Sequence, residues 1–302
     1  GINAEYGANP DHKMNQFNQK SLAGFKKIPL TSEETGQGRA YRYVDPTNEQ
    51  NVVVCKEVNL LAYSPPQREK IEQESQFFEN QDYSNEKLGF HVVNYLGSEQ
   101  IGDKLFIYQE YCDGGTLCDL IVNKQAPKDL IWYVMIVGMH ALARLHANCI
   151  VHRDVKPDNV MFLGGHLKLI DFGSMKLFQF ENASTDVGNE IFKAPEVGML
   201  ESYSAGVDIF SLGVTLYCLD QLYIPISQSE ISCKKIINLE VKPVLERMLA
   251  RVDKRIDVDE FFGLALIQGK IVELWDRWDF SHMVQEIAGK DSYLVQNRFY
   301  KD

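Results

Sequence analysis

The segment from His152 to Asn159 constrains most strongly what this chain can fold into. It reads His-Arg-Asp-Val-Lys-Pro-Asp-Asn, and Asp171-Phe172-Gly173 begins twelve residues after Asn159. Together the two segments hold carboxylates, an ammonium group and a carboxamide. Such groups can orient a hydroxyl, approach an anion and bind a divalent cation through hard oxygen ligands. A polar loop without a function is the alternative, but it would also have to account for Ala194-Pro195-Glu196 further along the chain.

The order and spacing of these three segments are those of the eukaryotic protein kinases, which the chain resembles over about residues 28–267. The resemblance implies an α+β fold with two lobes, a small β-rich N-terminal lobe and a larger helical C-terminal lobe. It also implies transfer of the γ-phosphate of ATP, with Mg²⁺ as cofactor, to Ser or Thr hydroxyls of protein or peptide substrates.

The resemblance assigns the catalytic roles residue by residue. Asp154 would orient the substrate hydroxyl, and Lys156 would lie near the moving phosphate. Asn159 and Asp171 would bind magnesium. A lysine two residues after the aspartate is typical of the serine/threonine class, because tyrosine kinases usually carry a different pattern there.

In the N-terminal lobe, Lys56 ends the run Val52-Val53-Val54-Cys55-Lys56 and would hold the α- and β-phosphates. It needs a carboxylate partner on the following helix, predicted from Gln67 to about Asn80. We select Glu74, because Phe78 lies one helical turn further along the same face, as the family pattern requires.

The glycine-rich loop departs from the family pattern G-x-G-x-x-G-x-V. Gly36 and Gly38 match the first two glycines, and their backbone N–H groups would approach the phosphates. On this alignment Tyr41 takes the place of the third glycine and Tyr43 that of the valine. The loop would then cover the nucleotide less closely.

The segment from Ile107 to Gly115 resembles the hinge of the family. Gln109 would be the gatekeeper, and the backbone of Glu110 and Cys112 would hydrogen-bond adenine. Two further residues, Val54 and Met161, would sandwich the adenine ring.

The activation loop would run from Ser174 to Lys193. Thr185 is the predicted phosphosite and Ser184 its close alternative. Arg153 and Lys176 would receive the phosphate and so order the loop. Where the family usually has Gly-Thr before Ala-Pro-Glu, this chain has Gly188-Asn189.

Structural roles follow from the same resemblance. Glu196 would pair with Arg255, and Asp208 would be the buried carboxylate that anchors the catalytic loop. His152 is interpreted as a packed scaffold histidine and not as an acid or base.

Composition excludes some partners. The 302 residues carry a net charge of −11, which disfavours general electrostatic binding to nucleic acid or to an anionic membrane. The acidic surface would suit basic peptide substrates, but an excess of acidic residues is more often only a solvated surface.

The six cysteines form no C-x-x-C pair, which favours reduced thiols and a cytoplasmic or nuclear location. The apolar run from Ile131 to Ala143 is interpreted as a buried helix too short to cross a bilayer, and residues 1–20 contain no apolar leader. The oligomeric state is not readable, and a monomer is assumed.

The organisation predicted along the chain has three parts. Residues 1–27 form a polar N-terminal extension, an arm or strap. Residues 28–267 form the kinase domain, with lobes over 28–111 and 114–267, and residues 268–302 form a helical C-terminal extension. Strands are expected over 39–45, 51–58, 92–96 and 104–111, and helices over 130–147, 206–219, about 240–250 and 257–267.

Two other functions compete with an active protein kinase. A pseudokinase or scaffold is suggested by Tyr41, Tyr43 and Asn189, although no catalytic group is missing. A small-molecule kinase of similar architecture is disfavoured by Ala194-Pro195-Glu196 and by the segment around Asp208. The single-domain layout and the activation loop loosely suggest a NIMA-related or numb-associated kinase, but no segment distinguishes the subfamily.

Overall fold

The structure is a computed structural model that describes residues 17–30, 38–69, 71–72, 85–170, 190–197 and 205–288. The described residues divide into two compact units. Unit 1 contains those up to Lys87 together with Val93–Tyr111. Unit 2 contains the short segment Leu88–Val92 and the described residues from Cys112 onward.

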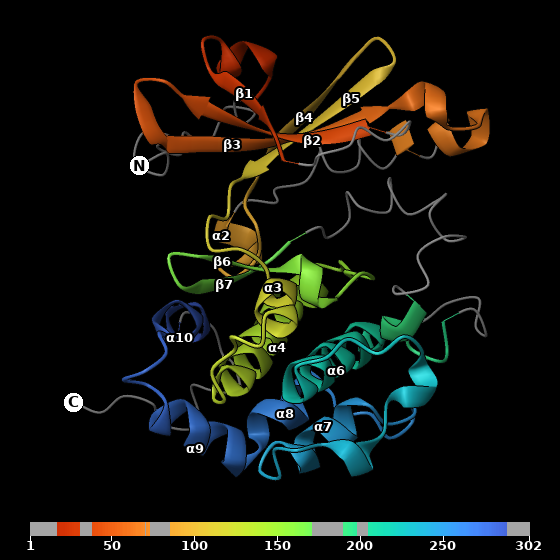
Figure 1. Ribbon diagram of the computed structural model, residues 1–302, viewed down its shortest axis with the longest axis vertical. Coiled ribbons are helices and arrows are strands. Elements are labelled where there is room, and N and C mark those ends of the chain that lie inside the picture. The colour runs from red at the N-terminus through yellow and green to blue at the C-terminus, as the bar shows by residue number, and fades with distance from the viewer. Residues whose placement is uncertain are drawn as a thin grey trace. The chain divides into compact units, whose positions relative to one another are not determined.

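Unit 1 is built on an antiparallel sheet with the strand order β1-β2-β3-β5-β4 (Figure 1). Its elements are β1 (Lys26–Pro29), β2 (Gly38–Asp45), β3 (Asn48–Asn59), β4 (Tyr95–Ile101), β5 (Lys104–Glu110) and the short 3-10 turns η2 (Gln19–Leu22) and η3 (Leu60–Ala62). The short helix α2 (Asn85–Leu88) ends at the boundary, with its last residue in unit 2. The turn between β2 and β3 is closed by Asp45, whose carboxylate accepts the Thr47 N–H at 2.8 Å.

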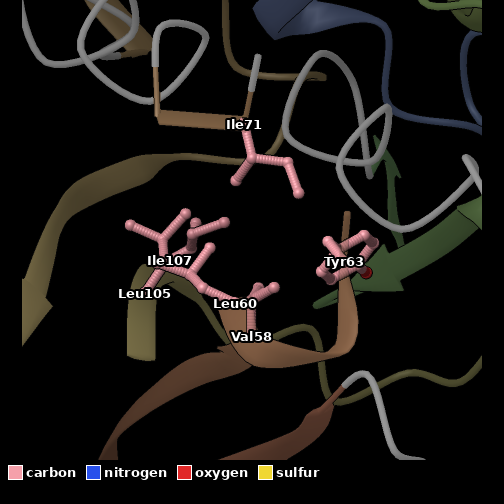
Figure 2. Packing of buried hydrophobic residues seen from close by; sticks show 6 residues of the cluster. All are labelled: Val58, Leu60, Tyr63, Ile71, Leu105 and Ile107. Carbon is pink, nitrogen blue, oxygen red and sulfur yellow. The ribbon is translucent and has the colours of Figure 1, made fainter. Parts of the chain in front are cut away.

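Each face of this sheet carries its own hydrophobic cluster. One cluster is formed by Val58, Leu60, Tyr63, Ile71, Leu105 and Ile107, and Figure 2 shows these side chains converging. Ile71 is helical, as are residues 65–69, which begin at Pro65. Ser64 caps residues 65–69 through hydrogen bonds with Gln67 at 2.7 and 2.8 Å. The predicted start of the helix is confirmed, while residues 73–84 lie outside the described part of the chain.

The opposite face is covered by the described part of the N-terminal extension. Leu22 is buried in a cluster with Tyr43, Val53, Cys55, Phe106 and Tyr108, and Phe17 packs against it. The Phe17 N–H donates to Leu96 O at 3.1 Å, and its ring lies 5.4 Å from that of Tyr108. From residue 17 on, the extension is therefore a strap seated across the sheet.

Unit 2 is mostly helical (Figure 1). Its helices are α3 (Leu117–Val122), α4 (Leu130–Ala147), α6 (Gly206–Gln221), α7 (Lys242–Met248), α8 (Val258–Gly263), α9 (Ala265–Glu273) and α10 (Ser281–Ala288), with the 3-10 turns η4 (Pro157–Asn159), η5 (Glu190–Phe192), η6 (Gln228–Glu230) and η7 (Cys233–Lys235). A two-stranded antiparallel ribbon, β6 (Val160–Leu163) and β7 (His166–Leu169), lies beside α4.

The core of unit 2 is the pair α4 and α6. Both are apolar around most of their circumference, which is the pattern of a helix buried on all sides. They approach closely at Gly138, where an added Cβ would lie 3.2 Å from Leu212. α4 has 18 residues and is apolar enough to cross a bilayer by length and composition, so the expectation that it is too short was wrong; 78% of it is buried inside the unit, as in a core helix.

Several predicted boundaries shift. Val92 was expected in a strand over 92–96, but it pairs with Leu169 of unit 2 and β4 begins only at Tyr95. The predicted helix over 257–267 is two helices, because Leu264 takes an extended conformation between α8 and α9. The helices predicted over 130–147 and 206–219 are confirmed to within two residues.

Candidate active site

The catalytic loop occupies residues 151–159 of unit 2, between α4 and β6. Lys156 precedes Pro157 and is therefore held extended, with φ −156° and ψ 165°. The proline then opens the turn η4, which ends at Asn159. This change of direction brings the two ends of the loop back together.

Three of the predicted site residues meet at the carboxylate of Asp154: Asp154 itself and Lys156, predicted as catalytic, and Asn159, predicted as a magnesium ligand. The Asn159 side-chain N–H group donates to Asp154 Oδ2 at 2.7 Å and to the Asp154 carbonyl at 2.8 Å. Lys156 Nζ lies 3.5 Å from the same Oδ2. Asn159 is 3% exposed, so its hydrogen bonds to Asp154 are shielded from water.

The loop is anchored by Asp208, a fully buried residue of α6. Its Oδ2 accepts the His152 N–H and its Oδ1 accepts the Arg153 N–H, both at 2.8 Å. His146, near the end of α4, lies 2.8 Å from Oδ2 through Nε2. The structure therefore places Asp208 where the predicted anchoring carboxylate should be.

His152 is a scaffold residue. Its Nε2–H donates to Ile170 O at 2.6 Å, and its Nδ1 accepts the Asp154 N–H at 3.1 Å, which specifies the neutral tautomer. Burial lowers the pKa of His152, although Asp208 and the bond to Ile170 act in the opposite direction. A buried neutral imidazole with both nitrogens engaged connects the loop to the residue before Asp171.

Glu196 and Arg255 form the predicted buried ion pair. Arg255 Nη2 donates to Glu196 Oε2 at 3.1 Å, and Nη1 donates to Oε1 and also to the Gly206 carbonyl at 3.0 Å. The hydrogen bonds from Arg255 hold the pKa of Glu196 below its usual value. The pair ties the segment before α6 to the chain before α8.

In unit 1, three predicted nucleotide-binding residues share one face of the sheet. Val54 pairs directly with Gln109, and Lys56 pairs with Ile107. Since side chains alternate along a strand, Val54, Lys56 and Gln109 all lie on the face that carries the Val58 cluster. All three are buried.

The register of β2 differs from the alignment inferred for the glycine-rich loop. Ala40 pairs with Lys56, whereas Tyr41 pairs with Cys55 and Tyr43 with Val53 on the opposite face. Tyr43 is buried under the N-terminal strap. The residue opposite Lys56 is therefore Ala40, and both tyrosines lie on the other face of the sheet from Lys56.

The pairing of β2 with β3 requires a glycine at position 38. Its φ is 146°, and an added Cβ would lie 2.0 Å from the backbone oxygen of Glu57 in β3. Only glycine allows this approach of β2 to β3. The proposed contact of Gly38 with a phosphate stays a prediction.

The predicted hinge residues fall on both sides of a unit boundary in the chain. Glu110 ends β5, and its N–H donates to Asn94 O at 2.9 Å. Cys112 is buried in unit 2. Two residues further on, the Gly114 N–H donates to Phe162 O at 2.9 Å, and Thr116 pairs with Met161 of β6.

One of the two predicted magnesium ligands, Asn159, lies in the described part of the chain. The Asn159 amide nitrogen faces Asp154, so its oxygen points to the other side of the amide carbon. A carboxamide oxygen is a hard donor of the kind Mg²⁺ takes. The other predicted ligand lies outside the described residues, as do five more predicted site residues: Asp171, Gly36, Glu74, Lys176, Ser184 and Thr185.

Sequence reasoning missed two residues of this site. His146 supports Asp208 from α4, and Asn94 holds Glu110 through its N–H, which donates to Glu110 Oε1 at 2.7 Å. His146 had a weak signal, being a polar residue at the end of an apolar helix. Asn94 had no sequence signal, because its contact with Glu110 depends on how β4 and β5 are arranged.

An antiparallel sheet that carries a buried lysine, and a helical unit that gathers Asp, Lys and Asn in one loop, define a phosphotransferase fold of the protein kinase class. The chain belongs to the protein kinase domain family, which matches residues 33–261. This confirms the predicted family and the two-lobed α+β fold.

Among similar curated proteins, serine/threonine-protein kinase PAK 1 of Mus musculus is 35% identical over 200 residues, which are 64% of this chain and 35% of that protein. Serine/threonine-protein kinase pak-1 of Caenorhabditis elegans is 32% identical over 180 residues, or 59% of this chain and 30% of that one. The chain thus spans about a third of the length of these relatives. Neither supports the loose suggestion of a NIMA-related or numb-associated kinase.

Among solved structures, the crystal structure of the M. tuberculosis PknI kinase domain has a TM-score of 0.60 and 17% identity, and the match covers 84% of this chain and 96% of that one. At this identity the likeness shows the fold alone.

Proposed function

We propose that this chain is an active serine/threonine protein kinase domain that transfers the γ-phosphate of ATP to Ser or Thr hydroxyls of protein substrates. The main support for this proposal is that the side chains of Lys156 and Asn159 both approach the Asp154 carboxylate. The names of the curated relatives support the serine/threonine class. The pseudokinase alternative was suggested partly by Tyr41 and Tyr43. The strand register weakens this argument, because both tyrosines face away from Lys56.

In the proposed reaction, Asp154 orients the substrate hydroxyl. Its Oδ2 is engaged by Asn159 and Lys156, so we assign Oδ1 to the hydroxyl. Lys156 is placed to balance charge on the phosphoryl group as it moves. Lys56 would position the α- and β-phosphates with Glu74 as its partner, and the backbone of Glu110 and Cys112 would hold adenine.

Asn159 and Asp171 are the proposed magnesium ligands. The cation would neutralise charge on the phosphates when it is bound. Phosphorylation at Thr185, or at Ser184, is proposed to order the activation loop through Arg153 and Lys176.

We further propose that the protein acts in the cytoplasm or nucleus as a monomer, without nucleic acid binding or membrane insertion. The net charge of −11 and the six free cysteines support this location and the absence of nucleic acid. The burial of α4 supports the absence of a membrane span.

The test is phosphate incorporation from labelled ATP into a Ser/Thr peptide library, with Asp154→Asn as the matched isosteric variant. We expect incorporation by the wild type and a loss of about 10²–10⁴-fold in the variant. Equal incorporation by both proteins would show that the activity comes from a contaminant. No incorporation by either, together with no thermal stabilisation by Mg-ATP, would reject an active kinase.

A further inference from the structure

Helix α10 lies beyond the part of the chain that matches the kinase family, yet it is built into unit 2. Phe280 and Met283 are fully buried. Phe280 lies 5.7 Å from the ring of Tyr133 on α4, and Trp278 stacks on the same ring at 4.9 Å. The C-terminal extension is therefore anchored firmly enough to act on what it touches.

α10 touches the segment Leu88–Val92 through Glu286. Glu286 Oε1 accepts the Phe90 N–H at 2.5 Å. Its Oε2 lies 2.7 Å from His140 Nε2 on α4, and Arg144 Nε lies 3.9 Å away. One carboxylate thus connects α10, the central helix and the backbone of the segment.

The segment is shaped for this contact. Gly89 has a φ of 90°, which a larger residue would adopt only with strain, and an added Cβ would lie 2.7 Å from Glu286 Oε2 and so displace this carboxylate. The Phe90 ring stacks on His282 of α10 with centroids 3.6 Å apart and planes 8° apart. The ammonium group of the buried Lys168 also lies over the Phe90 ring, 4.0 Å from the ring centroid.

The position of this segment in the chain makes the contact consequential. Leu88–Val92 belongs to unit 2, but the residues on both sides of it belong to unit 1. It follows the region predicted to carry Glu74 and precedes β4. It also pairs with β7, where the Leu169 N–H donates to His91 O at 2.7 Å and His91 Nδ1–H donates to Leu167 O at 2.8 Å. β7 leads within two residues to Asp171.

We propose that Glu286 is a positioning residue for phosphoryl transfer, and that α10 acts as a built-in brace that holds Leu88–Val92 in place. Within unit 2, the brace fixes this segment against β7, the strand that leads to Asp171. The C-terminal extension is then a required part of the catalytic domain. This inference rests on the proposed kinase function for its activity readout, but not for its structural readout.

The structural test is amide hydrogen exchange in the full chain. In the wild type, we expect the Phe90 amide to be protected as strongly as amides in the middle of α4. Glu286→Ala should raise its exchange rate about tenfold or more, while exchange within β3 stays unchanged. Gln285→Ala is the matched control, because Gln285 is an exposed neighbour on the same helix. An unprotected Phe90 amide in the wild type would overturn the proposal without any variant.

The activity test separates positioning from stability. At a temperature well below unfolding, Glu286→Ala should lower kcat about tenfold with little change in the peptide KM, and Gln285→Ala should not. Glu286→Gln should restore most of kcat and of the Phe90 protection, since its oxygen can still accept the Phe90 N–H. If Glu286→Ala loses thermal stability but keeps kcat, the residue is only structural and the proposal is wrong. An inactive wild type with a protected Phe90 would reject the kinase function and not the brace.

Discussion

Asp208 holds the backbone of Arg153 in a left-handed conformation. The Arg153 N–H donates to Asp208 Oδ1 at 2.8 Å, and the φ of Arg153 is 68°. That conformation costs a residue with a side chain about 1–2 kcal/mol. The cost falls directly before Asp154, so the buried carboxylate stabilises the turn from which the proposed catalytic residue projects.

Replacing Asp208 by Asn should therefore affect both stability and activity. The amide can accept from only one of the two backbone N–H groups and turns its own NH₂ toward the other. We expect the free energy of unfolding to fall by about 1–3 kcal/mol and kcat to fall at least about tenfold. Urea unfolding and steady-state phosphorylation measure the two effects.

Asp220 provides the control for this experiment. At the other end of α6, it accepts the N–H groups of Ile237 and Asn238 at 2.8 and 2.9 Å. Asp220→Asn should cost stability by the same mechanism but leave kcat unchanged. An equal loss of kcat in both variants would mean that Asp208 has no specific role in the loop.

The pair Glu196–Arg255 should contribute strongly to stability. Glu196→Ala leaves a buried guanidinium without its carboxylate, so we expect a loss of about 3–5 kcal/mol. Asp253→Ala, which breaks an exposed pair with Arg251, should cost no more than about 1 kcal/mol. Since the pKa of Glu196 is lowered, its contribution is present above the ordinary carboxyl pKa and is lost as the pH falls through the lower folded value. Similar unfolding midpoints for the two variants would contradict this.

Gly38→Ala tests the strand register in unit 1. The methyl group would meet the Glu57 backbone oxygen, in addition to the cost of the positive φ. Gly102, with φ 60° and no atom within 4 Å of an added Cβ, shows the cost of a positive φ without a steric contact, at an angle that alanine tolerates better than the φ of 146° at Gly38. We expect Gly102→Ala to cost about 1–2 kcal/mol and Gly38→Ala clearly more, as measured by thermal unfolding. Equal costs would mean that β2 and β3 are paired differently.

His91 should make stability depend on pH. Burial, as the main cause, lowers its pKa from 6.5 to about 3. Between these values the unfolded chain binds a proton that the folded protein does not, so stability falls as the pH falls from 6.5 toward 3. His91→Asn keeps a donor for Leu167 O but does not titrate. We expect it to reduce the pH slope of the unfolding free energy by up to about 1.4 kcal/mol per pH unit. Unfolding measured at pH 7.5, 6.0 and 5.0 checks this, and identical slopes would refute it.

Thr185→Ala should lower the activity of the phosphorylated protein toward that of the unphosphorylated one, because the phosphate proposed to pair with Arg153 and Lys176 is absent. Mass spectrometry before and after incubation with Mg-ATP locates the phosphate. Modification confined to Ser184 would move the site by one residue, and no modification of either residue would reject this route of activation.

Much of unit 2 could be predicted because its signals are local. The helices at 130–147 and 206–219 follow from long apolar stretches, and the turn at Asn159 follows from Pro157. The meeting of Lys156 and Asn159 at Asp154 needs only a few residues of chain. Residues so close in sequence have little freedom to be arranged in another way.

The rest depended on contacts between distant residues. Which face Tyr41 and Tyr43 occupy is decided by the pairing of β2 with β3, and a shift of one residue would reverse it. Val92 has the residue type of a strand and was expected to lie beside β4, but it pairs with Leu169 of β7 in unit 2. Asp208 was expected as an anchor, yet its partner His146 was not.

The sequence by itself thus determined the family, the order of the catalytic residues and the two central helices, since these depend on residue type and short-range spacing. Only the tertiary structure decided that the N-terminal strap covers the sheet, that Ala40 stands opposite Lys56 and that Glu286 reaches Phe90. Such contacts join residues as far apart as 196 positions. Their formation depends on how whole elements pack, and no local pattern in the chain encodes that packing.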